Sequence, residues 1–108
     1  MTTSMRWQIG DTTLTSIVEA ETRHVPLGLF YPDASAADVQ PAQPWLVDGM
    51  ADADGSAITF RVQAFVVHHA GQTVLIDPCV GNGKHLEMIF WNELATPWLD
   101  DLRRAGVD

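Results

Sequence analysis

The stretch of residues 57–78, AITFRVQAFVVHHAGQTVLIDP, constrains the fold of this chain more than any other feature. It begins with alternating apolar and polar residues, the period of a half-buried strand, and becomes continuously apolar at 64–67. A tight Ala-Gly-Gln turn separates it from a second apolar run that ends abruptly on Asp77. The pattern predicts a hairpin of strands at about 58–69 and 73–77, the first running from a sheet edge into a place covered on both faces.

A second hairpin is predicted near the start of the chain. RWQIGDTTLTSIVEAE places a Gly-Asp turn between a short strand at about 6–9 and a longer one at about 14–21, rich in Thr, Ile and Val. Residues 22–56 then hold four of the six prolines, which predicts a long irregular segment. Within it, DASAADVQ predicts one helical turn capped by Asp33 or Ser35.

The last predicted element is a helix in TPWLDDLRRAGVD. Thr96 is suited to the N-cap, Pro97 to the first helical position and Gly106 to the C-terminal stop. Acidic residues in the early turns and arginines in the last turn complement the helix dipole. The expected buried stripe consists of Trp98, Leu99 and Leu102.

These elements predict an α/β (α+β) fold, a largely antiparallel sheet of two hairpins with one or two helices packed on it. A chain of 108 residues is one small domain or part of a larger one. Because 46% of the residues are hydrophobic and 19% are charged, an ordinary globular composition, we expect the chain to fold. We interpret 1–108 as a single partial domain.

The charge and the single cysteine narrow the classes of function. Six basic against fourteen acidic residues give a net charge of -8, which repels phosphate backbones and anionic lipid, so we expect no nucleic-acid or membrane partner. Cys79 alone cannot form an internal disulfide and fits a reducing compartment. No apolar run approaches the ~20 residues of a membrane span, and the first residues lack the apolar core of a secretory signal. We therefore expect a soluble cytoplasmic protein.

The histidines and the glycine-rich turn are poor candidates for a metal or phosphate site. GNGKH lacks the P-loop pattern, because Pro78 stands where that loop needs Gly and His85 where it needs Ser or Thr. His68 and His69 are neighbours that point to opposite faces of a strand, so they cannot share one ion. His24 has no neighbouring His or Cys in the sequence.

Other side chains leave two interpretations open. Cys79 lies near Lys84 and His85 in sequence and could be a nucleophile, although a small buried hydrophobe is the commoner role. The aromatic residues of the Pro-rich segment either line a substrate pocket or fill a small core; they are Phe30, Tyr31 and Trp45. Asp52 and Asp54 share a turn and could hold a hard cation weakly, without a histidine beside them to help hold zinc.

Asp77 is the most suggestive carboxylate. At the end of an apolar strand it should be hydrogen-bonded or paired, because a stranded buried charge costs several kcal/mol. One interpretation is that it accepts hydrogen bonds from backbone amides near 80–82. The other is that it orients a metal-binding loop.

QAFVVHHAGQTVLIDPCVGNGKH, followed by WNELATPWLDDLRRAGVD, resembles the amino-terminal portion of the metallo-β-lactamase-fold hydrolases. The resemblance is to the branch that contains lactonases and methyl-parathion-hydrolase-like enzymes. It runs from about Ile9 to the last residue, with Pro78 where that branch more often has Thr. It implies the first part of an αββα sandwich, in which Asp77 is not a ligand but hydrogen-bonds the metal-ligand loop.

In a full-length relative, the resemblance implies two metal ions, usually zinc, that generate a hydroxide to attack a lactone, an ester or a phosphotriester. Their ligands lie in an HxHxDH motif and later residues, which this sequence does not contain. Phe30, Tyr31 and Trp45 would be pocket wall. We therefore expect an inactive fragment that binds no zinc and self-associates through uncovered apolar surface. The alternative is a non-catalytic, acidic, β-rich interaction module.

Overall fold

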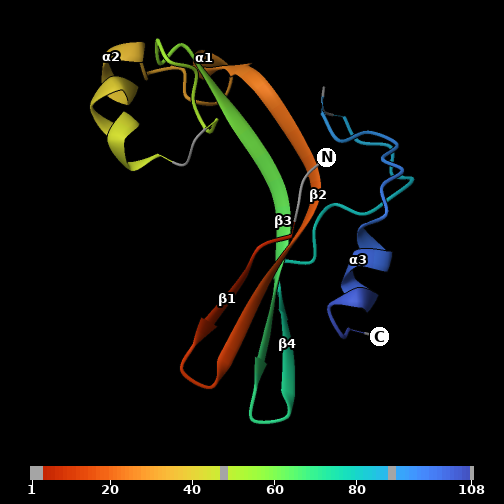
Figure 1. The fold of residues 1–108 in the computed structure, drawn as a ribbon. Helices are drawn as coiled ribbons and strands as arrows, with labels where there is room; N and C mark the ends of the chain where they lie inside the picture. Colours follow the sequence, from red (N-terminus) through yellow and green to blue (C-terminus); the bar gives the residue numbers. More distant parts are fainter. Residues whose placement is uncertain (1–3, 47–48, 88–89, 108) are drawn as a thin grey trace. The chain divides into compact units, whose positions relative to one another are not determined.

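The computed structural model describes residues 4–46, 49–87 and 90–107. Four strands form one sheet in the order β1-β2-β3-β4, and the described pairs β1–β2 and β3–β4 are antiparallel (Figure 1). The strands are β1 (Arg6–Ile9), β2 (Thr12–Pro26), β3 (Ala57–His69) and β4 (Gln72–Ile76). With a few short helices, this sheet places the fold in the α+β class, as predicted.

The helical elements are short. They are α1 (Leu27–Phe30), α2 (Ala36–Val39), the 3-10 helix η1 (Gln40–Trp45) and α3 (Trp98–Arg104). No helix among the described residues is long and apolar enough to cross a membrane. The chain forms two compact units, Met1–Ala20 with Val62–Asp108 and Glu21–Arg61, and β2 and β3 each run through both.

The turn between β3 and β4 sets the register of the sheet's most hydrophobic pair. Ala70 and Gly71 both have positive φ, at 49° and 77°, as a two-residue hairpin turn that matches the strand twist requires. The register pairs Val66 with Leu75, so these two side chains share one face. Their neighbours Phe65 and Ile76, which also pair, lie on the opposite face.

One face of the sheet in the first unit is covered by α3. Ile17, Ala64 and Val66 from the strands form the buried core with Trp98 and Leu102 from the helix. α3 lies beside the strands in Figure 1. The predicted buried stripe is therefore wrong in one member, since Leu99 is 46% exposed.

The ends of α3 differ in how well the sequence predicted them. Gly106 has φ +90°, and the N–H groups of Gly106 and Val107 donate to the carbonyls of Arg103 and Leu102, both at 3.0 Å. This is the Schellman motif that a glycine stop favours. The Thr96 cap is wrong, because Pro97 occupies the N-cap and the Thr96 backbone N–H donates to Asn82 Oδ1 at 3.0 Å.

The opposite face of the sheet remains apolar and exposed. Trp7 and Ile9 on β1 are 37% and 66% exposed, and Val74 and Ile76 on β4 are 52% and 48% exposed. The register places Val74 and Ile76 on the face away from the core, opposite Val67 and Phe65. Trp7 joins this face, because its ring centroid lies 6.5 Å from that of Phe65. We call Trp7, Ile9, Val74 and Ile76 the open face.

The second unit has its own contacts. Phe30 at the end of α1 packs against Phe60 on β3, with ring centroids 4.4 Å apart. Ser35 is the N-cap of α2, one of the two predicted caps, and its N–H donates to the Asp38 carboxylate at 2.7 Å. Arg61 donates two hydrogen bonds to Oε2 of Glu21, at 3.0 and 2.7 Å. Aromatic packing and a paired carboxylate therefore hold this unit together.

Candidate functional site

The turn after β4 is held by Glu19, a residue that the sequence analysis missed. Glu19 on β2 is only 5% exposed, and its two carboxylate oxygens accept hydrogen bonds from the N–H groups of Val80 and Gly81 at 3.1 and 2.9 Å. A carboxylate bonded to two backbone amides satisfies most of its need for donors without water. The sequence does contain a signal for this role. Glu19 is a charged residue between Val18 and Ala20, within an apolar stretch of the strand that begins at Ile17.

Asp77 does not take one of the two roles predicted for it, that of accepting hydrogen bonds from the backbone amides of this turn. Its side chain is exposed, and its backbone has φ 56°, which turns the chain sharply at the end of β4. The amides of Val80 and Gly81 belong to Glu19. The prediction that Asp77 caps them is therefore wrong, because the turn folds back toward β2 rather than toward the carboxyl end of β4.

Cys79 follows the commoner of its two interpretations. It is partly buried and packs against the core cluster of α3 and the sheet. Burial, together with the negative charges of Glu19 and Asp77, raises the pKa of its thiol to about 11. Because the thiolate is the reactive form, this environment disfavours a nucleophile or a metal ligand at neutral pH.

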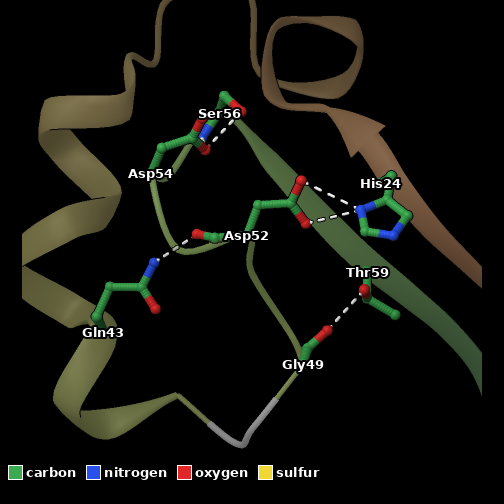
Figure 2. A network of polar contacts seen from close by, with 7 residues as sticks. All are labelled: His24, Gln43, Gly49, Asp52, Asp54, Ser56 and Thr59. Carbon is green, nitrogen blue, oxygen red and sulfur yellow. Dashed lines mark hydrogen bonds and ion pairs between the residues drawn. The ribbon is translucent and has the colours of Figure 1, made fainter.

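A histidine and a carboxylate meet in the second unit, although the sequence analysis found no histidine beside Asp52. His24 has φ 56° at the end of β2, and its Nδ1 lies 2.9 and 3.1 Å from the two carboxylate oxygens of Asp52. Figure 2 shows this pair between β2 and the loop before β3. Residues 28 apart in the chain are brought together because β2 and β3 are neighbours in the sheet.

Further hydrogen bonds around this pair hold the loop before β3 in place. Gln43 donates to the backbone carbonyl of Asp52 at 2.8 Å, and Thr59 donates to the carbonyl of Gly49 at 2.7 Å (Figure 2). The Ser56 hydroxyl donates to Asp54 at 2.6 Å, and this hydrogen bond lowers the pKa of the Asp54 carboxyl. Since Ser56 bonds Asp54 rather than His24, the cluster has no Ser–His–Asp relay.

The remaining histidines, His68, His69 and His85, each contact different residues. His68 Nε2 lies 2.8 Å from the Ala105 carbonyl, so that nitrogen carries the proton, and Nδ1 faces the Thr73 hydroxyl at 3.0 Å. His69 Nδ1 lies 2.9 Å from the Thr12 hydroxyl. His85 is 85% exposed and lies 3.9 Å from Glu93. In the described part of the chain, no three His, Cys, Asp or Glu side chains converge as metal ligands.

The aromatic residues proposed as pocket wall are brought together only in part. Phe30 and Tyr31 line a depression of about 470 Å³ with Pro32, Ala34 and two aspartates. Trp45 is not part of its lining, and its side chain is 88% exposed. Phe30 also packs on Phe60, so it serves the core of the second unit as well as the depression.

Glu19 and the polar contacts around Asp52 hold loops in place, and the Cys79 thiol is kept protonated by its surroundings. No protein-family model, curated protein or solved structure matches the chain.

Proposed function

We propose that this chain is the first part of an αββα sandwich, the amino-terminal portion of a metal-dependent hydrolase of the metallo-β-lactamase fold. The observation that carries the proposal is the one-sided packing of the sheet. α3 covers one face, while the open face keeps apolar side chains about half exposed. Such a face is typical of an inner layer that packs on a second sheet. The sequence resemblance supplies the family.

The residues present do not fit a metal centre. Among the described residues no group of three ligands converges, and the pKa of about 11 keeps the Cys79 thiol protonated. In the proposed enzyme this chain forms one layer of the sandwich and the turn at its edge. Glu19 fixes that turn after β4. Asp77 is exposed beside the turn, and we propose that its carboxylate hydrogen-bonds a later metal-ligand loop.

In the proposed enzyme, later residues would hold the metal, and zinc bound there would supply an activated water for the hydrolysis of a lactone, an ester or a phosphotriester. Phe30 and Tyr31 are the residues of this chain that we propose for the wall of the small-molecule pocket. Trp45 is a weaker candidate, because it lies outside the depression that the other two line. The chain on its own is proposed to be inactive and to bind no zinc.

The test is the coding sequence beyond the codon for Asp108. A continuation that encodes HxHxDH supports the proposal, and joined expression of both parts should give hydrolysis that depends on added zinc. A stop codon contradicts it. Calorimetry that gave stoichiometric zinc binding to the 108-residue chain, or hydrolysis by that chain alone, would contradict the assignment of all metal ligands to later residues.

A second candidate is a non-catalytic interaction module, and the same open face favours it. In that case the apolar side chains on β1 and β4 bind a separate protein rather than a later layer of the same chain. The net charge of -8 would then select a partner that carries basic residues around an apolar centre. A stop codon directly after the codon for Asp108, which would contradict the hydrolase proposal, is the result expected for the interaction module.

A further inference from the structure

A pocket of about 340 Å³ lies in the first unit, between the C-terminal half of α3 and the sheet. Its volume is at the lower end of the ~300–1,000 Å³ of small-molecule sites. Ile17, only 1% exposed, contributes an apolar surface to its lining. The polar and charged residues of its lining are Ser4, Arg6, Thr15, His68, Asp101 and Arg104.

Two of the chain's six basic residues meet at this pocket. Elsewhere the arginines are held by neighbouring acids: Arg23 and Arg61 by Glu21, and Arg103 by Asp100. Arg104 is partly engaged by Asp101, at 2.7 Å. Arg6 forms no ion pair with the part of the chain that the structure describes, so its guanidinium keeps its donors available.

The other polar groups refine the choice of ligand. His68 already bonds the Ala105 carbonyl and faces the Thr73 hydroxyl, so it forms a wall and offers no free donor. The hydroxyls of Ser4 and Thr15 can each donate one hydrogen bond. Together these groups give donors above an apolar surface, with one carboxylate partly offsetting two guanidinium charges.

We propose that this pocket binds a small oxyanion, a carboxylate or phosphate group, with Arg6 as its main anchor. The planar guanidinium fork matches the two oxygens of such a group, and charge-assisted bonds of this kind are about twice as strong as neutral ones. On a chain of net charge -8, most of the surface repels an anion, so the pocket offers a local exception. This inference does not depend on the proposed hydrolase.

The test is a titration of the intact 108-residue chain, ¹⁵N-labelled, with inorganic phosphate, with acetate and with chloride as the control anion. Saturable shifts should appear at Arg6, Thr15 and His68, and not at Thr59 in the second unit. Phosphate binding tighter than acetate assigns the site to a phosphate-bearing ligand, and the reverse order assigns it to a carboxylate. Either order supports the proposal.

Matched variants separate the pocket from the general effect of charge. Arg6→Ala should weaken binding about ten-fold or more, whereas Arg103→Ala, which removes the same charge one residue from the pocket, should leave it within about two-fold. Asp101→Asn should tighten binding, because it removes the competing carboxylate from Arg104. Arg6→Lys keeps the charge without the fork and should retain part of the affinity.

Three results would overturn the proposal. One is that neither phosphate nor acetate gives saturable shifts, which would place both dissociation constants above about 10 mM. Another is equal weakening by Arg6→Ala and Arg103→Ala, which would mean that only net charge matters. The third is weaker binding by Asp101→Asn in a variant whose amide spectrum is otherwise that of the parent, since the carboxylate would then be helping the ligand to bind.

Discussion

The buried carboxylate of Glu19 fixes the backbone after β4 through two amide hydrogen bonds. Replacing it with alanine leaves the N–H groups of Val80 and Gly81 without their acceptor in a half-buried place. We expect Glu19→Ala to lower the free energy of unfolding by about 3 kcal/mol, measured by urea denaturation. Asp77→Asn is the matched control, because Asp77 is exposed, and its effect should stay within about 0.5 kcal/mol. Equal effects of the two variants would contradict the assignment of the turn to Glu19.

Cys79 gives a second measurement at the scale of one residue. Its thiol pKa is raised from 9.0 to about 11, first by burial and then by the charges of Glu19 and Asp77. Below both values, the folded chain holds about 100-fold less thiolate than an unperturbed thiol does. We expect alkylation by iodoacetamide at pH 8 to be slower than that of a small free thiol by about this factor. Denaturant should restore the rate, and fast alkylation of the folded chain would contradict the prediction.

Glu21 and Arg61 link β2 to β3 within the second unit, and their pairing makes stability depend on pH. The Arg61 hydrogen bond, with the charges of Arg23 and Arg61, holds the pKa of the Glu21 carboxyl below its usual 4.5, against the effect of burial. A carboxyl with a lowered folded-state pKa stabilises the protein above its unfolded value, and this stability is lost as the pH falls below 4.5 through the folded pKa.

We therefore expect the free energy of unfolding to fall with pH in this window, and Glu21→Gln to flatten the fall. The measurement is a series of urea denaturation curves between about pH 6 and pH 3, the range over which carboxyl groups titrate. Asp100→Asn is the control, since its pair with Arg103 has both side chains more than 60% exposed and contributes little. An unchanged profile in Glu21→Gln would show that other carboxyls set the acid limit.

The elements that sequence predicted well are those whose signals are local. The β3–β4 turn and the glycine stop of α3 depend on backbone conformations that few residues adopt, so Gly71 and Gly106 mark them reliably. Glu19 and Asp77 were confused because their roles depend on which strand the turn folds against, and this is a contact between residues about 60 positions apart. The His24–Asp52 pair was missed for the same reason, since it joins β2 to the loop before β3, 28 residues further along the chain.

At the scale of the whole molecule, apolar exposure and net charge oppose each other. The open face offers four large apolar side chains that are 37–66% exposed, and burying them against another surface is favourable by roughly 25 cal/mol per Å². Two copies of a chain with net charge -8 repel one another. Salt screens the repulsion and leaves the burial of apolar surface intact, because the Debye length falls from ~30 Å at 0.01 M to ~3 Å at 1 M. The balance between the two terms should therefore shift with ionic strength.

We accordingly expect the chain to associate with itself through the open face, and more strongly at high salt. Sedimentation velocity at tens of micromolar protein, the order at which weak complexes form, should show a dimer fraction that grows with salt and concentration. Ile76→Lys should abolish it. Leu29→Lys is the matched control, because Leu29 is 50% exposed against 48% for Ile76 but lies on α1 and not on the sheet. A monomer at every salt concentration would contradict self-association and leave the open face to a later layer of the same protein or to a different partner. Equal loss of the dimer in both variants would mean that added charge, and not this face, controls assembly.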